Sequence, residues 1–318
     1  MYGSVFKRLW KIWEWGIGRT VAATIAAHIN SISVGMCQGY SAVLIPQLQA
    51  THFAHITQDD ASWIASLGVI STPGGAILAG LLTEVLGRKT AIQLTSVPFL
   101  IGWAIIAFST GKFSLYLGRF ISGLAIGMAS ACYIYVAEIA HPDQRGFLSA
   151  FGPIFVSLGV LIVYSLGYLM TWKSVATLCA VVAVISFSVV HIIPESPSWS
   201  VSKKKITQAK TALIWLRRNP AIADEELAQI MASVKTSQDD TEEKNLMHYI
   251  SNFVKPCVWK PFLILIVFFL FQEGTGMYVV LYYAVNVFQK LGSSMNDYVA
   301  SIVVALVRLI MSILGSIC

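Results

Sequence analysis

Long apolar runs recur along the chain, separated by short polar stretches. Each run reaches about 20 residues or more, which is the length that an α-helix needs to cross roughly 30 Å of hydrocarbon. The eight runs occupy residues 21–45, 61–82, 90–109, 114–137, 147–170, 174–193, 261–288 and 298–318. Because only helices satisfy every backbone group in lipid without leaving edges, the pattern predicts an all-α membrane protein.

A long polar insert separates the first six runs from the last two. Within it, apolar residues recur at three- and four-residue steps over 206–218 and 221–234, which predicts two short amphipathic surface helices. The expected organisation is a tail at 1–20, a six-helix bundle at 21–193, a linker at 194–259 and the first two helices of a second bundle at 260–318. A complete second bundle would need further helices, so we expect the chain to be a fragment or a short form.

Composition and charge fix the environment and the orientation. Charged residues make up 12% of the chain, whereas soluble domains carry about 25%. Of the 22 Lys and Arg residues, 17 lie in the tail, the loops after the second and fourth runs, and the segment from Lys203 to Lys260. The positive-inside rule therefore places the tail and the linker in the cytosol, as parts of a multi-pass protein that we expect in the plasma membrane. The basic balance indicates loops facing anionic lipid and no nucleic-acid partner.

Chemistry beyond binding is not indicated. The five cysteines are scattered and show neither a zinc spacing nor a disulfide framework. There is no glycine-rich phosphate loop and no nucleophile elbow. The sequence predicts no metal, no cofactor and no enzymatic activity.

Four motifs stand at the ends of predicted helices. They are Gly80-Leu-Leu-Thr-Glu84-Val-Leu-Gly87-Arg88-Lys89, Arg119-x-x-x-Gly123-x-x-x-Gly127, Glu138-Ile-Ala-His-Pro-Asp-Gln-Arg145-Gly146 and Pro194-Glu195-Ser-Pro197. In this order the set resembles the signatures of the sugar porter family of the major facilitator superfamily. The resemblance implies the major facilitator fold, here with a six-helix N-terminal bundle and an incomplete C-terminal bundle.

The resemblance also implies roles for these residues. Charged side chains at the cytosolic helix ends would form a gate of ion pairs that closes the inner side of the carrier: Glu84, Arg88, Glu138, Arg145 and Glu195. The alternative is a solvated charged rim, in which each exposed pair contributes only about 0 to 1 kcal/mol. Gly123 and Gly127, four residues apart, are typical of close helix packing.

The seventh run carries the predicted substrate site, because polar side chains inside a bilayer normally mark a pathway. Its stretch 271–283 resembles the sugar porter pattern Q-Q-x-S-G-x-N-x-x-x-Y-Y, which assigns substrate contacts to Gln272, Glu273, Tyr278, Tyr282 and Tyr283. The two last tyrosines have an alternative interpretation as part of an interfacial aromatic belt. Glu273 and Tyr278 depart from the pattern, and Pro153 stands where many glucose transporters place a binding glutamine. This proline and the short loop between the first two runs resemble insect facilitated trehalose transporters.

Three functions are compatible with these residues. The first is a monomeric facilitative carrier that passes trehalose or a hexose by alternating access. The second is a proton-coupled symporter, in which Glu273 would carry the proton, since residues 35–40 of the first run offer no acidic group. The third is a sensor of the same fold that binds sugar without transporting it.

Overall fold

The computed structural model describes residues 18–51, 53–239, 255–292 and 295–317, and over these ranges the chain is helical without any strand. Most of the expected tail at 1–20, and residues 240–254 of the linker, lie outside the described residues. Eight stretches of the described chain are long and apolar enough to cross a membrane. The predicted all-α membrane architecture is therefore confirmed.

Nine helices and two short 3-10 turns build the first six spans. They are α2 (Gly18–Ala50), η1 (Phe53–His55), α3 (Gln58–Ile70), α4 (Thr72–Leu86), α5 (Arg88–Ala107), α6 (Lys112–Met128), α7 (Ser130–Ile139), η2 (Pro142–Gln144), α8 (Arg145–Ser149), α9 (Phe151–Leu169) and α10 (Trp172–Val190). After them come α11 (Pro197–Ser202), α12 (Ile206–Arg217), α13 (Pro220–Asp239), α15 (Pro256–Gly274), α16 (Met277–Leu291) and α17 (Asp297–Ile317).

Four runs that the hydropathy pattern presents as continuous are divided in the structure, the fourth at Ala129 and the fifth at Ala150, and the other two at a proline or a glycine. The second run breaks at Ser71, where Pro73 opens α4 without a backbone N–H to donate. The seventh breaks between α15 and α16, where Gly276 has φ +69°, a left-handed conformation that glycine adopts without steric cost. Hydropathy averages over such single residues and therefore does not register the breaks.

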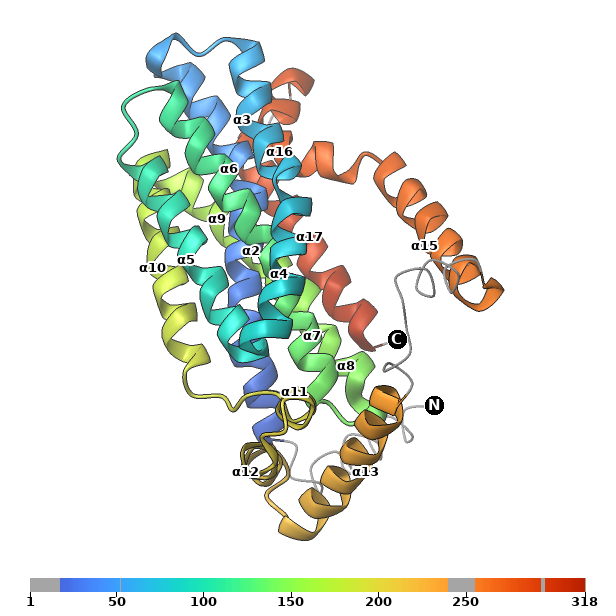
Figure 1. Cartoon of the computed structure of the whole chain (residues 1–318). Coiled ribbons are helices and arrows are strands. Elements are labelled where there is room, and N and C mark those ends of the chain that lie inside the picture. The colour runs from blue at the N-terminus through green and yellow to red at the C-terminus, as the bar shows by residue number, and fades with distance from the viewer. Residues whose placement is uncertain (1–17, 52, 240–254, 293–294, 318) are drawn as a thin grey trace.

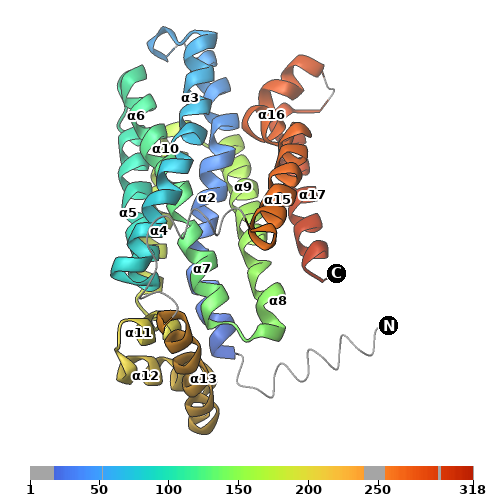
Figure 2. The same ribbon diagram turned by 45° about the vertical axis from the view of Figure 1, so that its right-hand side comes forward.

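Helix α2 lies at the centre of the six-span bundle, with α9, α10 and α16 packed around it (Figures 1 and 2). Tyr40 of α2 shows how the packing is specified. Its ring meets Trp103 of α5 edge-on with 4.9 Å between centroids, and its hydroxyl donates to the carbonyl oxygen of Trp172 at 2.8 Å. One buried side chain thus ties three spans together and leaves no polar atom of its own unsatisfied.

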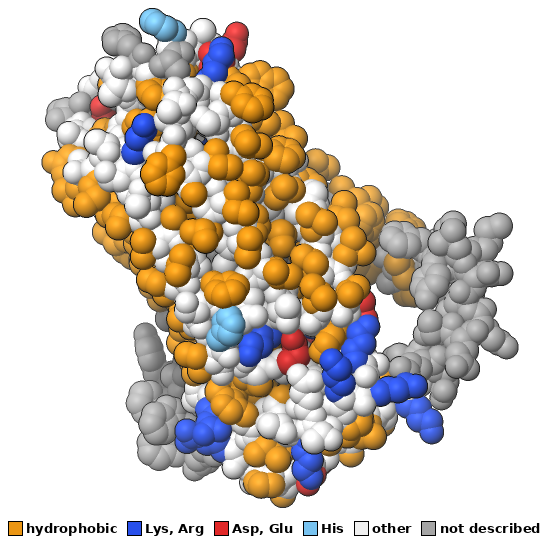
Figure 3. Space-filling model, turned by 60° about the vertical axis from the view of Figure 1, so that its left-hand side comes forward, with side chains coloured by type: hydrophobic (Ala, Val, Ile, Leu, Met, Phe, Trp, Pro, Cys, Tyr) orange, Lys and Arg blue, Asp and Glu red, His pale blue; other side chains and the backbone are white. Residues whose placement is uncertain are grey.

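The outer surface agrees with a lipid environment. Figure 3 shows hydrophobic side chains covering the middle of one face, while Lys, Arg, Asp and Glu gather toward its two ends. Large exposed hydrophobic side chains of the spans include Ile77, Leu81, Phe113 and Val181. An apolar belt between two polar ends is the pattern that a bilayer selects.

Helices α11, α12 and α13 lie together at one end of the bundle, below it in Figure 1, and we call this the linker end. Their shared apolar core contains Leu213 and Leu227. Arg217 fastens this unit to the bundle, because its guanidinium donates to the carbonyl oxygen of Ile139 at 3.0 Å and to the Thr20 hydroxyl at 3.2 Å. A bidentate pair with Glu226 neutralises the same guanidinium, which is 9% exposed.

Helix α15 extends away from the bundle, whereas α16 and α17 pack against α2 and α9 (Figure 1). Every residue from 255 to 271 is exposed. The break at Gly276 is what allows the two halves of the seventh run to take different directions.

Candidate functional site

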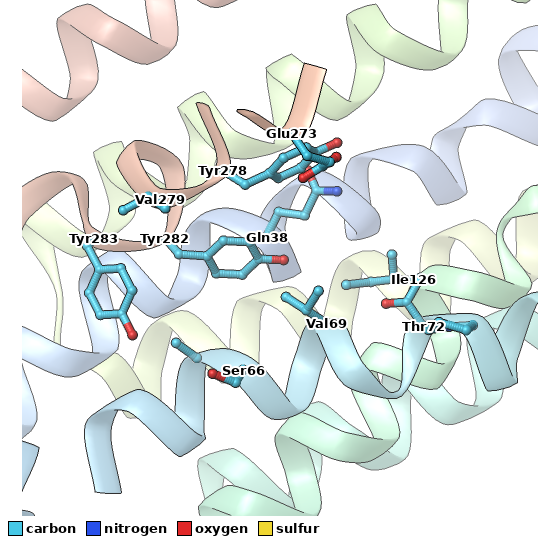
Figure 4. Close-up of a pocket in the computed structure, with 12 residues that line it drawn as sticks. Gln38, Ser66, Val69, Thr72, Ile126, Glu273, Tyr278, Val279, Tyr282 and Tyr283 are labelled. Carbon is cyan, nitrogen blue, oxygen red and sulfur yellow. The ribbon is translucent and has the colours of Figure 1, made fainter. Parts of the chain in front are cut away.

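A cavity of about 440 Å³ opens between the six-span bundle and α16. We call it the central cavity. Its lining comes from six helices, and Figure 4 shows the residues that form it: Gln38 of α2, Ala65, Ser66 and Val69 of α3, Thr72 and Pro73 of α4, Ile126 of α6, Glu273 of α15, and Tyr278, Val279, Tyr282 and Tyr283 of α16. Mostly apolar walls with a few convergent polar groups are typical of a small-molecule site.

Four of the five predicted substrate residues line this cavity: Glu273, Tyr278, Tyr282 and Tyr283. The buried Tyr282 reaches into the space between α16 and α3 (Figure 4), so it does not belong to an aromatic belt facing lipid headgroups. Tyr283 has non-helical dihedral angles inside α16 and packs against Ile45 and Ala61. Helix α16 therefore presents its aromatic side chains inward.

The structure does not bring Gln272 to the cavity. This residue lies near the C-terminal end of α15. Its carbonyl oxygen accepts hydrogen bonds from the backbone N–H of Thr275 at 3.3 Å and from the Thr275 hydroxyl at 2.6 Å. The resemblance groups it with the aromatic residues because they are close in sequence. Glu273, the next residue on α15, lines the cavity with these tyrosines, whereas Gln272 does not.

Gln38 is one of the cavity residues that the sequence did not assign to the site. Its amide extends from α2 toward the side of the cavity where Glu273 and Tyr278 lie (Figure 4). Its Oε1 is buried and accepts no hydrogen bond from the described residues. A buried acceptor without a partner is costly, so it marks a place where a ligand hydroxyl would be favourable. The sequence feature that indicates this role is an amide side chain in the middle of the first apolar run, because polar side chains inside a bilayer normally mark a pathway.

Arg119 is buried completely at the junction of α2, α3 and α6. Its guanidinium donates to the carbonyl oxygens of Ile64 at 3.1 Å and Cys37 at 3.0 Å, and to the Ser41 hydroxyl at 2.7 Å. Among the described residues no carboxylate forms an ion pair with it. The Arg119 Nη1 also lies 3.5 Å from the Cys37 Sγ, so the charge is held by two carbonyl oxygens, a hydroxyl and a thiol.

At the linker end, the predicted gate residues Arg88 and Glu138 form a bidentate ion pair. The Arg88 Nε lies 2.9 and 3.0 Å from the two carboxylate oxygens of Glu138, and its Nη2 lies 2.8 Å from Oε1. The Ser196 hydroxyl donates to the same carboxylate, and the Arg88 Nη1 donates to the carbonyl oxygen of Thr83 at 2.8 Å. Both charged side chains are at most one-fifth exposed, so solvent screens this pair less than a surface pair.

Glu195 caps the first turn of α5. One of its carboxylate oxygens accepts from the backbone N–H groups of Arg88 at 2.9 Å, Lys89 at 3.0 Å and Ser196 at 2.8 Å. Gly87 has φ +100°, and a Cβ added there would collide with this carboxylate. A negative charge at a helix N-terminus satisfies otherwise unpaired donors and complements the helix dipole. The glycine of the loop motif is thus required by the carboxylate of the Pro-Glu-Ser-Pro motif.

Of the other two gate residues, Glu84 lies at the exposed edge of this network and Arg145 lies outside it. Glu84 is 64% exposed at its side chain and reaches Arg88 at 3.6 Å and Lys203 at 3.2 Å. Arg145 begins α8, is exposed, and forms no ion pair with any residue that the structure describes. The structure therefore gathers Arg88, Glu138 and Glu195 and leaves Arg145 outside.

Gly123 and Gly127 lie where α6 meets the junction of α3 and α4. A Cβ at Gly123 would collide with the Ser71 hydroxyl, and one at Gly127 with the carbonyl oxygen of Thr72. The two glycines let α6 approach the backbone that forms one wall of the central cavity.

Over the ranges that the structure describes, no three His, Cys, Asp or Glu side chains lie close enough together to hold a metal ion.

The chain is similar in sequence to known sugar transporters. The chain is 31% identical over 295 residues to the facilitated trehalose transporter Tret1 of Bombyx mori and 32% identical over 292 residues to that of Apis mellifera ligustica. These matches cover 92% and 91% of this chain and 57% of each relative, so the chain spans just over half the length of the curated relatives that it matches.

Solved structures show the same fold. The proton:xylose symporter XylE bound to 6-bromo-6-deoxy-D-glucose, a major facilitator superfamily protein, superposes with a TM-score of 0.80 at 22% identity, over 93% of this chain and 68% of that one. A partially occluded inward-open form of XylE from E. coli gives 0.75 at 19% identity, over 93% and 72%. The predicted major facilitator fold is confirmed. The family model described as "Sugar (and other) transporter" matches residues 20–318, and the chain belongs to that family.

Proposed function

We propose that the protein is a facilitative sugar carrier that moves trehalose or a hexose down its gradient by alternating access. The observation that carries this proposal is the central cavity, which lies between the six-span bundle and α16 and contains an unsatisfied amide oxygen beside three tyrosines. Amides and hydroxyls bind sugar hydroxyls in fixed directions, and aromatic rings pack on the apolar face of a pyranose. The relatives described as facilitated trehalose transporters support trehalose as a substrate.

Uniport is favoured over proton symport by the surroundings of Arg119. Coupling requires a group inside the membrane that takes up and releases a proton, and the acceptors around Arg119 are two carbonyl oxygens, the Ser41 hydroxyl and the Cys37 sulfur, with no carboxylate among the described residues. Glu273 is the remaining candidate for such a group. It is exposed at the end of α15 and forms no ion pair among the described residues. Neither position has the geometry of a coupled pair.

The linker-end network acts in this proposal as the inner gate. Arg88, Glu138 and Glu195 join the ends of α5, α7 and the start of α11, and these contacts hold that side closed. Opening toward the cytosol would require the carboxylates to exchange protein donors for water. The concentration of Lys and Arg on this side supports a cytosolic linker and amino terminus, in a monomeric carrier of the plasma membrane.

Counterflow in proteoliposomes tests the proposal. The purified chain, reconstituted with unlabelled trehalose or glucose inside, should accumulate the labelled sugar with saturable kinetics. An imposed pH gradient should leave the initial rate unchanged, whereas acceleration by an inward proton gradient would establish symport. Sugar binding without counterflow would replace the carrier by a sensor of the same fold.

A further inference from the structure

A second cavity, of about 610 Å³, lies between α9, α16 and α17, and we call it the α9–α17 cavity. Met277 and Leu281 of α16 line it, whereas Tyr278 and Tyr282 line the central cavity. Helix α16 therefore separates the two. The walls are mostly apolar, and the polar side chains among the lining residues are Ser157, Tyr164, Arg308 and Ser312.

Arg308 places a positive charge in this apolar space. It lies on α17 about 16 Å along the helix axis from Asp297, near the middle of a membrane-spanning length. Its Nη1 is shielded from solvent and has no hydrogen-bond partner among the described residues. A guanidinium at this depth is unfavourable unless something compensates its charge.

The neighbouring polar groups do not compensate it. The Tyr164 hydroxyl donates to the carbonyl oxygen of Leu281 at 2.6 Å. The hydroxyls of Ser157 and Ser312 lie 2.9 Å apart and are bonded to each other, and the Ser312 hydroxyl also donates to the carbonyl oxygen of Arg308 at 2.9 Å. No described carboxylate lines the α9–α17 cavity, and Glu273 lines the central cavity instead. The site therefore carries a net positive charge and a pair of hydroxyls that can exchange partners.

From these contacts we infer that the α9–α17 cavity binds a sugar bearing a carboxylate or a phosphate, with Arg308 holding the anionic group. The planar fork of guanidinium N–H groups matches the oxygens of either anion, and burial strengthens such charge-assisted bonds. Ser157 and Ser312 are placed to bind ring hydroxyls of the same molecule. The inference rests on the proposed function, since it adds anionic sugars to the substrates of a sugar carrier.

Paired probes of equal ring size test the inference in proteoliposomes of the chain. We expect D-glucuronate or D-glucose 6-phosphate to compete at least tenfold more strongly than D-glucose for counterflow. Carriage of a univalent anion moves charge, so a potential of 100 mV should change its accumulation ratio by about 50-fold, while that of glucose stays constant. Whichever anion competes better identifies the group that Arg308 holds.

Two variants and one control locate the effect. Arg308→Gln should lose the anion preference while keeping glucose counterflow, and Arg308→Lys should retain part of the preference. Lys290→Gln removes the same charge from an exposed position on α16 outside the cavity and should behave as wild type. Because Arg308→Gln removes a charge without a counter-ion, its melting temperature in detergent should not fall below that of the wild type.

Thermal stabilisation by each ligand in detergent separates failure of this inference from failure of the proposed function. If no sugar is transported, yet glucuronate raises the melting temperature of wild type and not of Arg308→Gln, the carrier proposal fails and the anion site stands. Equal competition by glucose and both anions would overturn the anion site and leave the carrier proposal intact. Stabilisation by phosphatidylglycerol in place of either anionic sugar would also overturn it, because a lipid headgroup would then be the counter-ion.

Discussion

The linker end and the central cavity treat their polar side chains in opposite ways. At the linker end, Arg88, Glu138 and Glu195 are each satisfied by several protein donors or acceptors. In the central cavity, the buried Oε1 of Gln38 has no partner among the described residues. Satisfied charges hold one arrangement of helices, whereas an open acceptor is available to a ligand. The two regions thus correspond to the two requirements of a carrier, a conformation to switch and a molecule to bind.

Of the substitutions considered, replacing Arg88 should change the free energy of the closed linker end the most. Arg88→Gln leaves the carboxylate of Glu138, one-fifth exposed, without its ion-pair partner, at a cost of about 2–4 kcal/mol to the closed linker end. That cost would shift the balance between closed and open forms by about 30- to 700-fold. Hydrogen exchange at the Lys89 amide, which donates to Glu195, should accelerate accordingly.

Lys203→Gln is the matched control for this prediction. It removes the same charge from the same end, but Lys203 contacts only the exposed side chain of Glu84 among the described carboxylates, at 3.2 Å. Exposed pairs contribute about 0–1 kcal/mol, so exchange should change little. Similar exchange rates in the two variants would show that the network does not hold the gate.

Gln38→Ala should weaken sugar binding at least tenfold and leave the melting temperature unchanged. The substitution removes an acceptor that the protein itself does not use, so ligand affinity changes and folding does not. Gln289→Ala, at an exposed position near the end of α16, is the control for loss of an amide. A large fall in stability for Gln38→Ala would mean that its amide is a structural group.

Gln272→Ala tests whether the sequence resemblance or the structure identifies the amide that binds sugar. The resemblance to sugar porters predicts that this substitution abolishes most uptake, whereas the position of Gln272 on α15 predicts a smaller loss than for Gln38→Ala. Parallel counterflow assays of the two variants decide between them. A larger loss for Gln272→Ala would require α15 to move toward the cavity during transport.

Ser41→Ala should lower stability by about 1–2 kcal/mol, since it removes one acceptor from the buried guanidinium of Arg119. The carbonyl oxygens of Cys37 and Ile64 would remain, so the fold should persist. Uptake should stay independent of a pH gradient in this variant. A new pH dependence would show that Ser41 shields Arg119 from a titrating group.

Arg145→Gln should have the smallest effect, below about 0.5 kcal/mol on stability, and should leave counterflow unchanged. The side chain is exposed and forms no ion pair over the described ranges, unlike the neighbouring Arg88. A loss comparable to that of Arg88→Gln would support the gate role that the motif resemblance predicts for Arg145.

Much of the fold was accessible from local patterns. Each of the eight predicted spans corresponds to an apolar helical stretch, because hydropathy over about 20 residues is a property of the run itself. Tyr278, Tyr282 and Tyr283 were predicted as substrate contacts and line the central cavity together. The helix breaks at Ser71 and Gly276 were not predicted, because a hydropathy average does not register the dihedral angles of one residue.

The sequence by itself determined that this is a membrane protein of the sugar transporter family, with its charged motifs at helix ends. Tertiary structure alone decided which of those charges meet, joining Glu195 to the first turn of α5 and leaving Arg145 outside. It also placed Gln38 in the cavity and Gln272 away from it, and left the Nη1 of Arg308 without a partner. The physical reason is that hydropathy and motif spacing are set within one segment, whereas hydrogen-bond satisfaction depends on groups brought from distant segments.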